Sequence, residues 1–204
     1  MEPINWPITT GCDQISEGCN SCPSYWEAVK SGESYAVKEH WEELSVPQQM
    51  KTPMNYLVSF GSDLFHEDVS VLFIAEVFKV MNKCQQHIFE ILTKRSERAL
   101  DLASKFEWTP NIYFGVSIEL AETKYKIDHL RKMPAAFKTI SMVPILGPMG
   151  DLNLHGIDLV CATKETWGYK RPCDQQWIDD IKKQCAEQGV VFSAEHVVYE
   201  KEAV

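Results

Sequence analysis

Short apolar runs alternate with stretches of helical periodicity along most of this chain, and this alternation limits the folds that it can adopt. An apolar run recurs at intervals of roughly 20–30 residues, which is typical of strand–helix units around a parallel sheet. Six or seven such units suit a doubly wound sheet or an incomplete barrel, because a complete eightfold barrel needs about 250 residues and this chain has 204. The predicted strands cover residues 56–60, 87–92, 111–116, 137–142, 157–162 and 190–192.

The predicted helices lie between these strands. Residues 69–83 and 96–105 have apolar side chains on one helical face, and so has the segment that carries Leu120, Ile127 and Leu130. A last helix carries Trp177, Ile181 and Cys185 and ends before Gly189, which is a suitable C-cap. We therefore expect a single α/β domain over residues 1–204, with a short helix through Trp26 and Val29 and an irregular insertion at 31–54.

Charge and hydropathy exclude several classes of protein. Twenty Lys and Arg residues against twenty-nine Asp and Glu residues give a formal charge of −9, which disfavours broad non-specific binding to nucleic acid. No apolar run approaches the roughly 18 residues of a membrane span, and the first residues lack the basic segment and apolar core of a signal peptide. We expect a cytoplasmic protein with no membrane partner.

Polar residues follow each predicted strand. In sheets of this kind, ligands bind at the carboxyl ends of the strands, so these segments are the first place to seek a site. Polar strand-to-helix loops also occur in α/β proteins without any such role. The segments are residues 61–68, 93–95, 117–119, 143–148 and 163–165.

Three of the seven cysteines lie close together near the N-terminus, in the pattern C-x6-C-x2-C. The two residues between Cys19 and Cys22 let both sulfur atoms face one centre, and the glycines before Cys12 and Cys19 let the chain turn back. A cytosolic thiol cluster of this kind indicates a metal site. We define residues 11–23 as the cysteine loop.

The spacing alone leaves three interpretations of the cysteine loop open. Three thiolates suit a cubane iron–sulfur cluster that leaves one iron free for a ligand. They would also bind zinc if a fourth ligand came from elsewhere, such as His40 or Cys161. The third interpretation is ordinary thiols. Cys161 and Cys185 fall on apolar positions and are expected in the core.

Several motifs together resemble a known family. The runs Trp6–Cys12 and Ser16–Cys22 resemble the opening of an uncharacterised three-cysteine protein family that is common in bacteriophages and prophages. This family is similar in turn to radical S-adenosylmethionine proteins, especially the branch that includes spore photoproduct lyase. The further matching segments are S-D-L-F-H-E-D-V at 62–69, L-T-K-R at 92–95, G-V-S at 115–117, L-G-P at 146–148, Q-W at 176–177 and Q-C at 184–185.

The resemblance implies a partial (β/α) barrel of about six or seven parallel strands with a [4Fe-4S] cluster at its mouth. Cys12, Cys19 and Cys22 would be the cluster ligands, and S-adenosylmethionine would bind the open iron. Reduction by a flavodoxin or ferredoxin would then yield a 5′-deoxyadenosyl radical, which would modify an unidentified substrate, nucleic-acid-derived by analogy. The protein would act in the cytoplasm of the host.

The resemblance also implies roles for residues at the strand ends. One group would bind the cofactor: Asp63 its amine, Lys94 its carboxylate, and Ser117 and Glu119 its ribose. His66 would be a proton donor in the mouth. For each of these residues an ordinary structural role, such as a capping aspartate or a solvated lysine, stays open. The full set of cofactor-binding residues is Gly61, Ser62, Asp63, Thr93, Lys94, Ser117 and Glu119.

The chain departs from the family pattern at the rim. Where the pattern has Cys-Glu-Pro, this chain has Met142-Val143-Pro144, and a Gly-Gly-Glu-Ser-Gly run is replaced by residues 162–166. Pro23 stands in place of an aromatic residue, and Ser193-Ala194-Glu195-His196 replaces a Lys-Gln-Trp pattern. An alternative function is therefore a non-catalytic phage protein, on a decayed or zinc-bound version of the fold, that binds a host factor.

Overall fold

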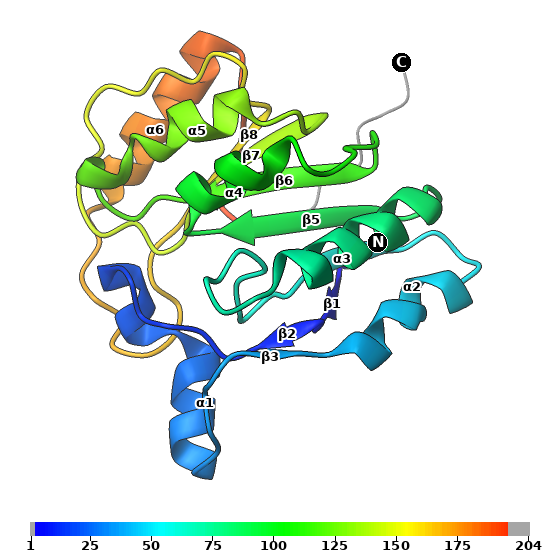
Figure 1. Ribbon diagram of the computed structural model, residues 1–204. Coiled ribbons are helices and arrows are strands. Elements are labelled where there is room, and N and C mark those ends of the chain that lie inside the picture. The colour runs from blue at the N-terminus through cyan, green and yellow to red at the C-terminus, as the bar shows by residue number, and fades with distance from the viewer. Residues whose placement is uncertain (1–2, 196–204) are drawn as a thin grey trace.

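One parallel sheet of seven strands organises the protein. The computed structural model describes residues 3–195, so both ends of the predicted 1–204 domain, His196 included, lie outside the described residues. The order of the strands in the sheet is their order in the chain, and every neighbouring pair is parallel (Figure 1). The strands are β1 (Ile4–Trp6), β4 (Asn55–Val58), β5 (Ile88–Thr93), β6 (Ile112–Ser117), β7 (Phe137–Met142), β8 (Leu159–Ala162) and β9 (Val191–Ser193).

This strand order distinguishes between the two architectures that the sequence allows. A doubly wound sheet reverses its strand order at a switch point, and this sheet has no reversal. The arrangement is consistent with a partial barrel, and among the described residues β1 and β9 are its two edges. The α/β class and the predicted number of parallel strands are confirmed.

Helices cover one face of the sheet and leave the other to a cavity. Successive side chains of a strand point to opposite faces. Phe89 and Ile91 of β5 belong to the main hydrophobic core together with Phe73 and Val77 of a helix. The alternate position Ile88 packs in a second cluster, with Tyr113, Phe137 and Leu159. The helices that connect the strands are α3 (Val71–Lys83), α4 (Ser96–Ala103), α5 (Lys126–Lys132) and α6 (Gln175–Gln188).

The helix ends show why these segments stop where they do. Helix α3 begins at Val71, two residues later than predicted, because the hydroxyl of Ser70 accepts a hydrogen bond from the Phe73 amide at 3.1 Å. Helix α6 ends at Gly189, which has a φ of 70°, so the predicted C-cap is confirmed. No helix within residues 3–195 is long and apolar enough to cross a bilayer.

The insertion at 31–54 is more regular than predicted. Strand β3 (Lys38–Glu39) pairs with β2 (Thr9–Thr10) in a small antiparallel sheet, and this pairing holds the insertion against the N-terminal segment. Elements of four or five residues are too short to show a period in the sequence. Helix α1 (Pro23–Ser31) is the short helix predicted through Trp26 and Val29. The remaining short elements are η1 (Glu17–Ser21), η2 (Trp41–Ser45), α2 (Val46–Gln49) and η3 (Ala121–Thr123).

Candidate active site

A cavity of about 510 Å³ opens at the carboxyl ends of the strands. Its volume lies within the roughly 300–1,000 Å³ that is usual for small-molecule sites. The lining comes from the cysteine loop, from Ser24 of α1 and Tyr35 of the insertion, from the strands or strand ends of β4 to β7, and from the segment after β8. The residues on the strands themselves are Leu57, Val58, Glu90, Leu92, Ser117 and Ser141.

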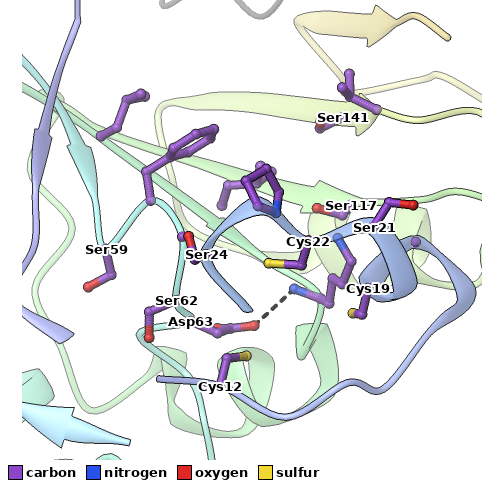
Figure 2. A pocket seen from close by; sticks show the side chains of 18 of the residues that line it. Cys12, Cys19, Ser21, Cys22, Ser24, Ser59, Ser62, Asp63, Ser117 and Ser141 are labelled. Atoms are coloured by element: carbon purple, nitrogen blue, oxygen red, sulfur yellow. Dashed lines mark hydrogen bonds between the residues drawn. The ribbon is translucent and has the colours of Figure 1, made fainter. Parts of the chain in front are cut away.

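All three cysteines of the cysteine loop line this cavity. Figure 2 shows their side chains around the same space as Asp63 and Ser117. Cys19 lies in η1, and Cys22 both follows that turn and precedes α1. The loop therefore crosses the edge at which the parallel strands end.

Each thiol has its own polar partner. Burial raises the pKa of the Cys12 thiol, although the nearby Arg95 guanidinium opposes this rise. Among residues 3–195, no three His, Cys, Asp or Glu side chains are gathered closely enough to hold a metal ion. Binding of a metal or cluster by the three thiols would replace the contacts that their sulfur atoms make now. These contacts are Cys12 Sγ–Arg95 Nη1 at 3.5 Å, Cys19 Sγ–Ser16 Oγ at 3.5 Å and Cys22 Sγ–Tyr35 Oη at 3.9 Å.

Neither residue that the sequence suggested as a fourth zinc ligand lies at the cavity. A cluster with one open iron takes three thiolate ligands from a protein, and all three thiols of the cysteine loop open onto the cavity. Tetrahedral zinc needs a fourth ligand, and neither candidate lines the cavity. His40 Nε2 bonds to the Thr10 hydroxyl at 2.8 Å, and the buried Cys161 thiol donates to the Glu195 carbonyl at 2.9 Å.

Two glycines let the cysteine loop pack closely against its neighbours. Gly11 has a φ of 79°, and a Cβ there would lie 2.2 Å from the Ala36 carbonyl oxygen. The Gly11 carbonyl also accepts a hydrogen bond from the Ser62 hydroxyl at 2.6 Å. A Cβ at Gly18 would lie 2.5 Å from Glu119 Oε1. The backbone of the loop therefore contacts its neighbours directly.

We expect Gly11→Ala to displace the cysteine loop. A positive φ costs an alanine about 1–2 kcal/mol, and at Gly11 the methyl group would also overlap the backbone of Ala36. Gly32→Ala is the matched control, because Gly32 has a φ of 71° with no atom within 4 Å of the added Cβ. Gly11→Ala should lower the urea midpoint more than Gly32→Ala and should speed the reaction of the loop thiols with a thiol reagent. Equal effects of the two substitutions would contradict this role of Gly11.

Asp63 connects the ends of β4 and β5. The carboxylate has about four acceptor positions, and they are filled from within the protein. The predicted role as acceptor of a cofactor amine would therefore need one of these donors to leave. The donors are Thr93 Oγ1 at 2.7 Å, the Phe65 amide at 2.9 Å, the Lys94 amide at 3.1 Å and Arg95 Nη1 at 3.3 Å.

Three further residues were predicted to bind the cofactor; two of them line the cavity, and the third supports Asp63. Gly61 and Ser62 line the cavity. Gly61 has a φ of 98° and lies against α1, where an added Cβ would be 2.4 Å from Ser24 Oγ. Thr93 is buried and does not line the cavity; its hydroxyl serves Asp63.

Lys94 and Glu119, both predicted to bind the cofactor, form an ion pair with each other at 2.8 Å. Burial alone would raise the pKa of Glu119, but Lys94, Lys126 and the Ser16 hydroxyl hold it below the usual range. Lys94 lines the cavity. To bind a cofactor carboxylate, its ammonium group would either contact Glu119 and the cofactor together or break its ion pair with Glu119.

His66 lies beside the cysteine loop and outside the cavity lining. The ring is buried, and its Nδ1 accepts the Asp68 amide hydrogen at 3.1 Å. The proton is therefore on Nε2, which donates to the carboxylate of Asp13 at 3.1 Å. In this position His66 anchors the residue next to Cys12. Ser117, by contrast, lines the cavity, and its carbonyl accepts from Lys126 Nζ at 3.0 Å.

The structure also gives contacts at the site to Arg95, Glu165 and Arg171, to which the sequence analysis assigned no role. Arg95 is buried between Asp63, Glu67 and Cys12, and it is the last residue of the L-T-K-R motif. Arg171 pairs with the buried Glu165 and donates to the Glu17 carbonyl at 3.0 Å, so the segment after β8 touches the cysteine loop.

Comparison with known proteins gave one match. No curated protein and no solved structure matches the chain. A family model described as "Protein of unknown function (DUF5131)" matches residues 3–197, which is nearly the full length. The chain belongs to the DUF5131 family.

Proposed function

We propose that this protein binds a [4Fe-4S] cluster and S-adenosylmethionine, and that it is a radical enzyme that modifies a substrate held in the cavity. The observation that carries the proposal is the opening of Cys12, Cys19 and Cys22 onto one cavity at the carboxyl ends of parallel strands. The motifs shared with radical S-adenosylmethionine proteins support it. We place the protein in the cytoplasm, that of the host if it is phage-encoded, with a flavodoxin or ferredoxin as reductant.

When bound, such a cluster would supply one electron to the sulfonium of S-adenosylmethionine, whose C5′–S bond would break to leave methionine and a 5′-deoxyadenosyl radical. The chain's own residues would hold charge and exclude water. Arg95, 3.5 Å from the sulfur of Cys12, offsets the negative charge of a thiolate there. Lys94 is a cation at the cavity wall that can bind a carboxylate. Leu57, Leu92 and Val143 make part of the wall apolar, which limits the access of water to a reactive intermediate.

The charged residues at the rim of the cavity are paired with other groups of the protein, and this favours a second, non-catalytic function. Lys94 is bound to Glu119, and Asp63 is filled with donors from the protein. A protein that has lost catalysis, or that binds zinc through the same thiols, would keep such contacts for stability. In this form the protein would bind a host factor.

Cofactor cleavage separates the two functions. After anaerobic reconstitution with iron and sulfide, we expect protein with dithionite and S-adenosylmethionine to release 5′-deoxyadenosine, even slowly and without substrate. The matched control omits dithionite and should release none. Zinc at about one equivalent without acid-labile sulfide would support the second candidate. Binding of S-adenosylmethionine without release, under strong reductant, would support the decayed version of the fold.

A further inference from the structure

Lys126 is a buried lysine that lies just outside the cavity. It is the first residue of α5 and is 4% exposed. Helix α5 packs against β6 (Figure 1), and the ammonium group of Lys126 donates to the carbonyl of Ser117, the last residue of that strand, at 3.0 Å. Ser117 lines the cavity and Lys126 does not. A lysine is almost never buried in this way unless it is paired with an opposite charge.

The carboxylate of Glu119 supplies the opposite charge. Burial lowers the pKa of Lys126, Glu119 has the largest opposing effect, and the charge of Lys94 acts in the same direction as burial. The hydrogen bonds of Glu119 are concentrated on Oε1, which accepts from Lys94 Nζ at 2.8 Å and from the Ser16 hydroxyl at 3.2 Å. Within residues 3–195, Glu119 Oε2 is buried and accepts no hydrogen bond. One carboxylate thus serves two lysines.

These three side chains, Lys94, Glu119 and Lys126, form a group that we call the charge trio. It holds two positive charges and one negative charge, so it has a net charge of +1. Asp63 is another carboxylate whose charge acts on both lysines, but it is paired with Arg95 at 3.3 Å. The positive charge of the trio is therefore in excess.

The excess charge lies where a ligand can use it. Lys94 lines the cavity, and its side chain is 23% exposed. If Lys126 were neutral, Lys94 and Glu119 would be a neutral pair, and a ligand carboxylate at Lys94 would compete with Glu119 for one cation. With Lys126 charged, there is one cation for each of the two carboxylates. Charges in a dry site need such pairing, because burial of an unpaired charge is costly.

We propose that Lys126 is a positioning residue for the ligand of this cavity: its charge balances that of Glu119, so that Lys94 can bind the carboxylate of S-adenosylmethionine. The identity of the ligand rests on the proposed function. The proposal also gives Glu119 a role that differs from the ribose contact implied by the family resemblance, since Glu119 holds the two lysines and does not touch the ligand. It agrees with the absence of Glu119 from the cavity lining within residues 3–195.

The test compares two ligands that differ by one carboxylate, S-adenosylmethionine and its decarboxylated form. Equilibrium dialysis against the full-length protein, reconstituted with iron and sulfide and kept oxidised so that no cleavage occurs, gives the ratio of their dissociation constants. We call this ratio the carboxylate preference. Lys126→Met removes the charge and should lower the preference about tenfold, through weaker binding of S-adenosylmethionine alone. Lys132→Met, at an exposed position of the same helix, is the matched control and should keep the wild-type preference.

The charge of the trio predicts an order among further variants. Glu119→Gln raises the net charge by one and should raise the carboxylate preference. Combining Glu119→Gln with Lys126→Met restores a net charge of +1 and should recover most of the preference that Lys126→Met loses. If Glu119 held the ribose instead, Glu119→Gln would weaken both ligands equally and would not rescue Lys126→Met. That result would overturn the proposal.

Each outcome of the experiment decides the proposal. Circular dichroism, the thermal midpoint, and iron and sulfide counts are measured for every variant. If Lys126→Met does not fold, the direction of the change in Glu119→Gln decides. Loss of iron in Lys126→Met would mean that Lys126 serves the Cys19 thiolate, whose charge also acts on it, and would overturn the proposal.

The same measurements separate this proposal from the proposed function. A cluster-loaded protein whose Lys126→Met variant keeps the full carboxylate preference would overturn the role of Lys126 and leave the proposed function intact. The predicted order of preferences in a protein that takes up no iron or sulfide would support the role of Lys126 and contradict the radical chemistry. Failure of the folded wild-type protein to bind S-adenosylmethionine would overturn both.

Discussion

Replacing Cys12, Cys19 or Cys22 by Ala is expected to remove nearly all the iron that the wild-type protein takes up in anaerobic reconstitution. A cluster with one open iron depends on three protein thiolates, so loss of one ligand leaves two irons without protein ligands. Iron should fall from about four atoms per chain to well below one, and acid-labile sulfide should fall with it. The broad absorption near the blue end of the spectrum, which thiolate-to-iron charge transfer produces, should bleach in parallel.

Three other cysteines serve as controls for this experiment. Cys84 and Cys185 are buried in the hydrophobic core, and Cys173 is a half-buried thiol away from the cavity lining. Their Ala variants should keep the iron and sulfide content of the wild-type protein. A similar loss in Cys173→Ala, or full iron content in Cys19→Ala, would show that the cysteine loop is not the ligand set.

Asp63→Ala is expected to lower the free energy of unfolding by about 3–5 kcal/mol, the usual effect of removing one partner of a buried ion pair. The side chains of Asp63 and Arg95 are 5% and 4% exposed, and their charges lie 3.3 Å apart. Without Asp63, the buried guanidinium of Arg95 keeps its charge with the exposed Glu67 carboxylate as its remaining ion-pair partner, and the Thr93 hydroxyl and Lys94 amide lose their acceptor. Urea denaturation, followed by circular dichroism, measures the change.

Two further variants test whether the buried ion pair causes this loss of stability. Asp101→Ala removes a carboxylate from an exposed position of α4 and should change stability by less than about 0.5 kcal/mol. The double variant Asp63→Ala with Arg95→Met removes both buried charges and should recover part of the loss, which a double-mutant cycle quantifies. No recovery in the double variant would mean that the hydrogen bonds of Asp63, rather than its charge, hold the strand ends together.

The central strands could be predicted from the sequence because each has a continuous apolar signal. Strands β5, β6 and β7 lie within one residue of their predicted limits at each end. Strand β1 was missed because it has three residues, two of them exposed, and only its pairing with β4 makes it a strand. Because β1 forms only through its contact with a distant part of the chain, no local periodicity in the sequence predicts it.

The positions of the candidate site residues were easier to predict than their partners. Polar residues after parallel strands meet at one edge, so the gathering of Ser62, Asp63 and Lys94 follows from the fold. The pairing of Lys94 with Glu119 depends on side-chain directions in three dimensions, which a pattern does not encode. Tyr35 reaches the site from the insertion and donates to the Gly61 carbonyl at 3.0 Å, although its segment has no periodic signal.

The edge position of β1 has a consequence for the timing of assembly on the ribosome. Residues 4–6 and the cysteine loop leave the ribosome before β4, with which β1 pairs and which follows about 50 residues later. Arg171, which bonds to the Glu17 carbonyl, is 154 residues further along the chain. At 5–20 residues per second, the three thiols wait about 8–30 s of translation for this contact. The cysteine loop is thus made well before the residue that holds it in place, and a nascent chain would meet oxidants and free metal ions before its cavity exists.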